Sequence, residues 1–148
     1  MLRCIAVMVL STVALTGCAR HRDVGRPSAR AIKRAYEHHA REAAIEWLDL
    51  VDHGEYEDAL DLEPQRIRAG VTAPQFVRSM RARRAPFGRA ISRNLVGSSY
   101  SRRMTGSPDA DYESLLFKTV FQHKRVAAER VILVSDHGTW RVVDYRLY

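Results

Sequence analysis

The chain has 148 residues, of which 24 are lysine or arginine and 17 are acidic, so its formal net charge is +7. This length fits one domain, and an apolar fraction of 46% is typical of a globular protein and too high for a disordered one. The only cysteines are Cys4 and Cys18, which excludes a disulfide scaffold, a thiolate zinc site and a cysteine nucleophile from the rest of the chain.

Residues 1–17 have the pattern of a lipoprotein signal peptide. Arg3 gives a positive start, an apolar run covers residues 4–15, and small residues precede Cys18. The run is shorter than the roughly 18 to 20 apolar residues that span a bilayer. The tetrapeptide Leu15-Thr16-Gly17-Cys18 resembles a bacterial lipobox, in which the cysteine thiol carries a diacylglycerol. We therefore predict that Cys18 is lipidated with palmitate or similar acyl chains and anchors the protein to a membrane.

The residues after Cys18 predict the location and the domain organisation. Ala19, in place of an aspartate, favours the outer membrane, with the protein facing the periplasm. Residues 18–30 are predicted to be a flexible basic tether, since residues 19–27 lack apolar periodicity. Residues 31–148 are predicted to form a single α+β domain.

Three helices are predicted in the first half of this domain. The first follows a capping serine, Ser28, and ends at Gly54. A second, shorter helix carries residues 56–60 and ends before Pro64. The sequence from Thr72 to Gln75 is a capping box, which opens a third helix that closes near residues 86–88. The apolar stripe of the first helix recurs every three or four residues and comprises Ile32, Tyr36, Ala40, Ala43, Ala44, Trp47, Leu48 and Val51.

Four strands are predicted in the second half, where the apolar residues alternate and Val, Ile and aromatic residues are frequent. A short turn at residues 136–138 separates the last two strands, a longer loop covers residues 105–111, and Gly97 is a candidate bulge. The predicted fold is thus α+β, with N-terminal helices packed on a curved four-stranded antiparallel sheet that forms a half-open cone. The strands span residues 90–104, 112–123, 127–135 and 139–147.

Charge is distributed in blocks along the chain. Residues 42–63 hold nine acidic residues and no lysine or arginine, whereas residues 64–108 hold ten arginines and no acid. The favoured interpretation is that these blocks neutralise each other inside the fold. The alternative is an exposed patch for an anionic envelope component, such as lipid headgroups, with Arg78, Arg81 and Arg84 as its candidates.

Several short stretches from about Ala40 to the C-terminus carry a family resemblance. They are Trp47–Asp52 with Gly54–Tyr56, Arg84–Gly88, Ser92-Arg93 with Leu95, Gly106–Asp109, Phe117–Phe121, Lys124, Glu129 and Gly138–Val142. In these stretches the chain resembles the bacterial family called domain of unknown function 4019. The resemblance implies a cone-shaped, cystatin-like fold similar to nuclear transport factor 2 and ketosteroid isomerase. It brings no established activity and no catalytic residue.

Such a cone suggests two functions. The first is a non-enzymatic binding or structural module that faces the periplasm and binds an envelope protein or another envelope component. The second is a small-molecule pocket, with or without acid–base catalysis of the ketosteroid isomerase type. An interior filled by aromatic residues would favour the first, and a deep cavity with a buried, unpaired carboxylate would favour the second. The candidate lining residues are Trp47, Phe76, Phe117 and Trp140.

Asp144 is the candidate base for such catalysis, because it is the only carboxylate on the last predicted strand. Strand alternation predicts that Asp144 shares a face with Trp140 and Val142, with Tyr145 on the other face. A pair between Asp144 and Arg146 is nevertheless the favoured interpretation. The candidate proton donors are Tyr100, Tyr112 and Tyr145.

No cofactor, metal or nucleic acid is predicted. His38 and Glu42 lie four residues apart, as do His53 and Glu57, and both are expected to be surface pairs because no third ligand is suggested. The arginine-rich segment lacks the interleaved aromatic residues of a nucleic-acid-binding surface.

An acidic alternation near the long loop has a similar interpretation. Asp109, Asp111 and Glu113 alternate as in the start of a calcium loop, but the glycine and the distant glutamate of an EF-hand are missing. We therefore expect these three residues to be solvated.

Overall fold

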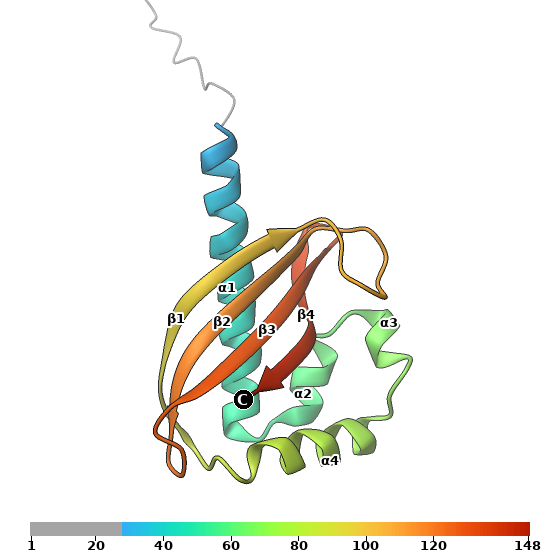
Figure 1. The fold of residues 1–148 in the computed structure, drawn as a ribbon. Coiled ribbons are helices and arrows are strands. Elements are labelled where there is room, and N and C mark those ends of the chain that lie inside the picture. The colour runs from blue at the N-terminus through green and yellow to red at the C-terminus, as the bar shows by residue number, and fades with distance from the viewer. Residues whose placement is uncertain (1–27) are drawn as a thin grey trace, which may run out of the picture.

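The fold comes from a computed structural model, which describes residues 28–148 (Figure 1). The predicted signal peptide, the lipidation site Cys18 and nearly all of the predicted tether lie outside the described residues. Within residues 28–148, no helix combines the length and the apolar character that crossing a membrane requires.

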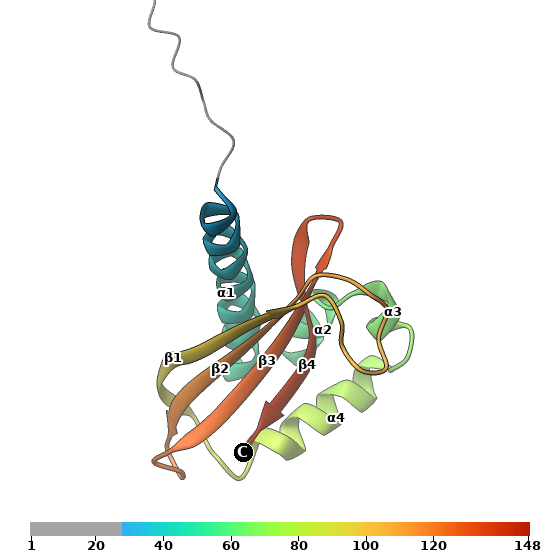
Figure 2. The ribbon, with the colours of Figure 1, turned by 45° about the horizontal axis from the view of Figure 1, so that its top comes forward.

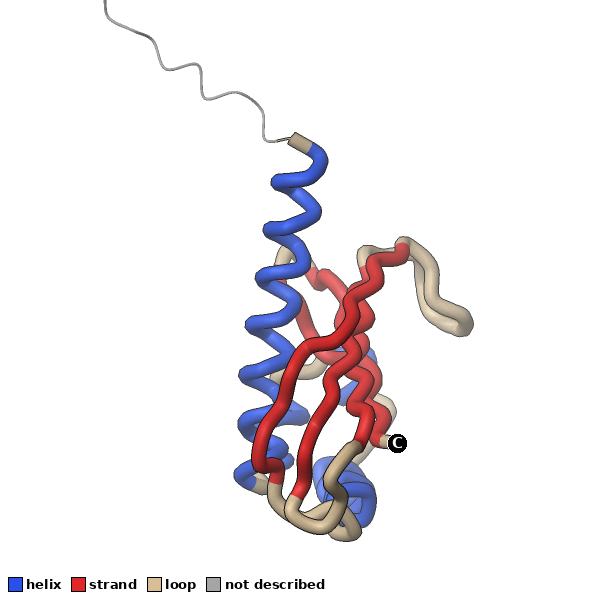
Figure 3. The backbone as a smooth tube through the Cα atoms, turned by 60° about the vertical axis from the view of Figure 1, so that its left-hand side comes forward, coloured by secondary structure: helices blue, strands red, loops and turns tan. Residues whose placement is uncertain are grey.

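Helix α1 (Ala29–His53) has the two caps that the sequence predicts. The Ser28 hydroxyl accepts a hydrogen bond from the backbone N–H of Ala31 at 3.2 Å, and Gly54 ends the helix with a φ of 81°. The helix begins at Ala29, so the last two residues of the predicted tether are helical. Its first turns extend beyond the sheet (Figures 1 and 3), and Ala40 is the first of its residues to be fully buried.

Three shorter helices follow, one more than predicted. They are α2 (Tyr56–Asp61), α3 (Gln65–Arg68) and α4 (Ala73–Arg84). The predicted capping box of α4 is confirmed, because the N–H of Gln75 donates to the Thr72 hydroxyl and the Gln75 side chain accepts from the Thr72 N–H. Helix α3 is a single turn after Pro64, and its four residues are too few to show a helical periodicity.

The four predicted strands are present and form one antiparallel sheet in the order β1-β2-β3-β4. They are β1 (Ala90–Ser101), β2 (Tyr112–Phe121), β3 (Ala127–Asp136) and β4 (Thr139–Leu147). Strands β1 and β2 end a few residues earlier than predicted. The predicted tight turn joins β3 to β4 through His137 and Gly138, which both have positive φ. The α+β class is therefore confirmed.

The helices cover one face of the sheet (Figures 1 and 2). Helix α1 lies across this face and α4 runs along one end of the strands, while the opposite face carries no helix among residues 28–148. The main core lies between α1 and the sheet, and a small second cluster of Tyr112, Ile132 and Val134 lies on the outer face.

The sheet has three register shifts, one near the start of β1 between Ala90 and Ser92 and two farther along the strands. One interrupts the pairing of β1 and β2 at Val96, next to the predicted position Gly97. The other lies at Val143, because Leu133 pairs with Val142 whereas Ile132 pairs with Asp144. The extra residue reverses the alternation after it.

This second bulge overturns one prediction. Trp140, Val142 and Tyr145 all face the core, whereas Asp144 lies on the outer face opposite Ile132. The prediction that Asp144 shares a face with Trp140 and Val142 was therefore wrong. Strict alternation holds only where the strand has no inserted residue.

Candidate functional site

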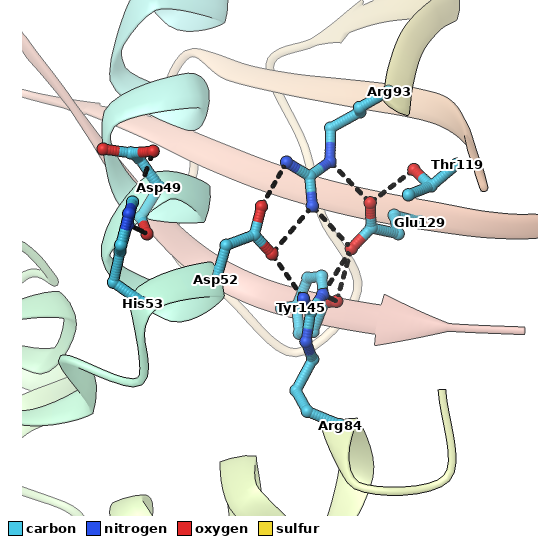
Figure 4. Close-up of polar contacts among 8 residues, drawn as sticks. All are labelled: Asp49, Asp52, His53, Arg84, Arg93, Thr119, Glu129 and Tyr145. Carbon is cyan, nitrogen blue, oxygen red and sulfur yellow. Dashed lines mark hydrogen bonds and ion pairs between the residues drawn. The ribbon is translucent and has the colours of Figure 1, made fainter. Parts of the chain in front are cut away.

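Two arginines and two carboxylates meet at the end of the core near α4 (Figure 4). Arg84 and Arg93 each pair with both Asp52 and Glu129, and the hydroxyls of Thr119 and Tyr145 complete the group. These six residues are called the charge network below. Its two positive and two negative charges cancel.

The geometry of the charge network is closed. Arg93 Nε donates to Glu129 Oε2 at 2.6 Å and Arg93 Nη1 to Asp52 Oδ2 at 2.8 Å. Arg84 Nη1 donates to Glu129 Oε1 at 2.9 Å, and its other terminal nitrogen pairs with Asp52. The Tyr145 hydroxyl donates to Glu129 Oε1 at 2.6 Å and accepts from Arg84 at 3.0 Å. Both oxygens of Glu129 are thus satisfied.

Each member of the charge network comes from a different element. Asp52 lies in the last turn of α1 and Arg84 ends α4. The four strands supply one residue each, in the order Arg93, Thr119, Glu129 and Tyr145. The side chains of Glu129 and Arg84 are 0% and 6% exposed, so water does not compete with these contacts. The network therefore connects both long helices to every strand.

The charges of the network are fixed at neutral pH. Burial alone would raise the pKa of Glu129, but the hydrogen bonds and charge of Arg93, with the hydroxyls of Thr119 and Tyr145, outweigh burial and hold this pKa below its usual range. Burial and the charge of Glu129 raise the pKa of Tyr145, so its phenol stays protonated. Burial lowers the pKa of Arg93, but the hydrogen bonds and charges of Asp52 and Glu129 outweigh burial and raise this pKa above its usual value.

This arrangement favours a structural role over proton transfer. General acid–base catalysis requires a group that titrates near the working pH, and the shifted groups of the network move away from that range. Removing one partner of a buried ion pair typically costs 3–5 kcal/mol, because the other charge is left buried. The network thus holds the helices and strands in register.

The predicted lining residues lie in or against the main core. Trp47, Phe117 and Trp140 are 1%, 2% and 7% exposed, and Phe76 is partly buried and packs against them. The ring centroids of Trp47 and Tyr145 are 5.2 Å apart. Aromatic side chains therefore fill the space between α1 and the sheet where these residues meet.

The three arginines of the predicted anionic-partner patch do not stay together. Arg84 is 5% exposed and belongs to the charge network, so it is not part of an exposed patch. Arg78 and Arg81 are exposed on α4 and form no ion pair with any residue of 28–148. Pairs such as Arg84 with Asp52, and Arg68 with Asp61 at 3.5 Å, do join the acidic and basic blocks as the favoured interpretation expects.

The candidate base Asp144 is paired rather than free. Its Oδ2 accepts a hydrogen bond from Arg146 Nε at 2.9 Å, as the favoured interpretation predicts. Asp144 lines a hollow of about 630 Å³ between the end of α4 and the end of β4. The candidate donors Tyr100 and Tyr112 bond elsewhere, to Asp111 and to the carbonyl of Pro108. The three tyrosines and Asp144 therefore do not converge.

One of the two predicted histidine pairs forms, whereas the pair of His53 with Glu57 does not. His38 lies 3.2 Å from Glu42, as expected. The Nδ1 atom of His53 instead lies 2.8 Å from the backbone carbonyl oxygen of Asp49 and 3.6 Å from the Asp49 carboxylate (Figure 4). The hydrogen bond to this carbonyl and the charge of Asp49 raise the pKa of His53. Within residues 28–148, no group of three histidine, cysteine or acidic side chains is placed to hold a metal ion.

Two buried glutamates were missed by the sequence analysis. Glu63, 5% exposed, follows α2, and burial raises its pKa from 4.5 to about 7, an effect that the nearby Trp47 indole reduces. Glu113 is 1% exposed, and neither of its carboxylate oxygens has a hydrogen-bond partner in the described part of the chain. Asp109 is exposed as expected. The expectation of a solvated Glu113 was wrong, because Glu113 lies on the same face of β2 as the buried Leu115 and faces α1.

The fold and site define an α+β domain whose open sheet is covered on one face by helices and fastened to them by buried ion pairs. The chain belongs to the family described as Protein of unknown function (DUF4019), whose model matches residues 43–145. No curated protein and no solved structure matches the chain significantly.

The match covers all six members of the charge network. Five of them also lie in the short stretches that carry the resemblance in the sequence: Asp52, Arg84, Arg93, Thr119 and Glu129. Four of these five residues are charged, and their presence in these stretches is the signal by which the network could have been found.

Proposed function

We propose that this protein is a lipid-anchored, non-enzymatic module of the bacterial envelope, attached through Cys18 and facing the periplasm. The observation that carries the proposal is the sequence Leu15-Thr16-Gly17-Cys18 after a short apolar run. Only nine residues separate Cys18 from the helix cap Ser28. The anchor would therefore hold the domain close to the membrane surface.

A binding or structural role, rather than catalysis, is supported by the core. Trp47 packs among other aromatic side chains in the core. In the charge network the pKa of Glu129 is lowered and that of Tyr145 is raised, so neither group titrates near pH 7. Arg78 and Arg81 are exposed on α4, where an anionic envelope component or an acidic protein surface can reach them.

The anchor is tested by replacing each cysteine in turn. Cys18→Ser is expected to abolish labelling with radioactive palmitate and to release the protein from the membrane fraction or leave it unprocessed. Cys4→Ser is the matched control, because it removes the only other thiol from the predicted signal peptide and should leave labelling unchanged. Equal labelling of the wild type and Cys18→Ser would contradict the proposal.

A further inference from the structure

A small apolar hollow opens between the first turns of α1 and the adjacent ends of β1 and β2. Its volume is about 280 Å³, which at roughly 30 Å³ per water-sized group is room for about nine non-hydrogen atoms. This is smaller than a drug-sized pocket. The residues that line it are Ala29, Ile32, Lys33, Tyr36, Tyr100 and Glu113, and it is called the Glu113 hollow below.

Glu113 is the one carboxylate of residues 28–148 whose two oxygens are both buried and both without a hydrogen-bond partner. A buried carboxylate is strongly disfavoured unless it is paired or protonated. The contrast with Glu129 is direct, because Glu129 on the next strand accepts from two arginines and two hydroxyls. The interior of this protein thus supplies partners for one buried glutamate and none for the other.

No lysine or arginine of residues 28–148 forms an ion pair with Glu113. Lys33, the only basic residue that lines the hollow, is 67% exposed, and its ammonium lies 3.7 Å from Glu37. No ion pair joins Lys33 to Glu113 within residues 28–148. Burial raises the pKa of Glu113 and the charge of Glu37 raises it further, whereas Lys33 lowers it. Lys33 thus acts on Glu113 through its charge, but no side chain of residues 28–148 forms an ion pair with this carboxylate.

We propose that the Glu113 hollow binds a small primary amine that carries an apolar group, with the ammonium on Glu113. The ammonium would supply the missing hydrogen bonds and charge, and charge-assisted bonds of this kind are about twice as strong as neutral ones. The apolar group would lie against Ile32 and the rings of Tyr36 and Tyr100. Aromatic rings also attract cations at close range, which adds to the preference for an amine.

The position of the hollow allows a ligand to enter. One wall is formed by the first turns of α1, where Ile32 and Tyr36 are 44% and 39% exposed. Segments with few buried contacts open locally at low cost. The larger hollow at Asp144 is a weaker candidate, because its carboxylate already has Arg146 as a partner.

The test uses the full chain in a non-ionic detergent and three probes of similar size. They are 2-phenylethylamine, the neutral 2-phenylethanol and the anionic phenylacetate. Binding is followed by NMR through the methyl shifts of Ile32 and the ring shifts of Tyr100, and through Tyr100 alone in variants that lack Ile32. We expect the amine to bind at least about tenfold more tightly than the alcohol, since one charge-assisted hydrogen bond contributes this much. Phenylacetate should not bind measurably.

Three variants make the assignment specific. Glu113→Gln keeps the shape of the side chain and should reduce the affinity for the amine to that for the alcohol. Glu63→Gln is the matched control, because it replaces another buried glutamate that does not line the hollow, and it should bind as the wild type does. Ile32 lines the hollow, and a Trp side chain at this position would occupy the space of the ligand. Ile32→Trp should therefore abolish binding of both probes even if Glu113→Gln does not fold.

The proposal is overturned if the amine and the alcohol bind with equal affinity. It is also overturned if Glu113→Gln or Ile32→Trp retains the amine preference, or if the amine fails to shift the Ile32 methyl groups up to its solubility limit. None of these measurements depends on Cys18. The amine-binding proposal can therefore fail while the proposed lipid anchor holds, and the anchor can fail while the amine-binding proposal holds.

Discussion

The charge network makes a specific prediction about the free energy of unfolding. Arg84→Met removes one guanidinium and leaves Asp52 and Glu129 to share Arg93 alone. The network then carries a net negative charge in a site where Glu129 is 0% exposed. We expect a loss of about 3–5 kcal/mol, the range measured when a buried ion pair loses one partner.

The measurement is urea and thermal unfolding of the full chain at pH 7, followed by circular dichroism. For a domain of this size the expected loss lowers the melting temperature by roughly 10 to 20 °C. Arg81→Met is the matched control, because it makes the same change on the same helix at an exposed position. It should change the free energy of unfolding by less than about 0.5 kcal/mol.

A double variant separates the ion pairs from simple packing. Arg84→Met removes one positive charge and Asp52→Asn one negative charge, so together they leave Arg93 and Glu129 as a neutral pair. Their combined cost should be smaller than the sum of the single costs, with a coupling of about 0.5–3 kcal/mol. If Arg84→Met is no more destabilising than Arg81→Met, or if the costs of Arg84→Met and Asp52→Asn simply add, the network does not hold the helices and strands together.

The remaining predictions concern pH, the surface and the thiols. Burial raises the pKa of Glu63 from 4.5 to about 7, so its stabilising contribution is present below the unfolded pKa and is lost as the pH rises through 7. In urea titrations, Glu63→Gln should therefore raise the free energy of unfolding by about 3 kcal/mol at pH 8 and have little effect at pH 4. In the released Cys18→Ser chain, Arg78→Gln combined with Arg81→Gln should weaken salt-sensitive binding to anionic vesicles without changing the melting temperature. The control pair is Arg102→Gln with Arg103→Gln, which removes the same charge from another loop and should leave vesicle binding unchanged. Dithiothreitol should not shift the melting temperature by several degrees, because no cysteine follows Cys18.

The helices and strands were predictable because their signals are local. Ser28, Gly54 and the Thr72 capping box mark helix ends through contacts within a few residues, and the structure confirms each of them. The turn at Gly138 is likewise set by neighbouring residues. The single-turn helix α3 was missed, since Gln65–Arg68 has no apolar stripe. Local patterns thus predict elements and not the contacts between them.

The charge network could not be predicted from spacing. Asp52 and Glu129 are far apart in sequence, and only the fold brings both to Arg84 and Arg93. The opposite charges of the two blocks indicated that pairs would form, but not which arginine would be buried. Arg84 differs from Arg81 because its place at the end of α4 directs its guanidinium to the core, where it also lies 4.8 Å from the ring centroid of Phe121.

Three buried glutamates show three ways in which the cost of burying a carboxylate is offset. Glu129 is surrounded by donors, which hold its pKa below the usual range. Glu63 has no such cations, and a pKa of about 7 lets it take up a proton instead. Among residues 28–148, Glu113 has no hydrogen-bond partner and forms no ion pair, although it lines an open apolar hollow. A structural carboxylate in an otherwise well-paired core would be expected to have a partner, so the missing partner of Glu113 is best sought in a molecule that this chain binds.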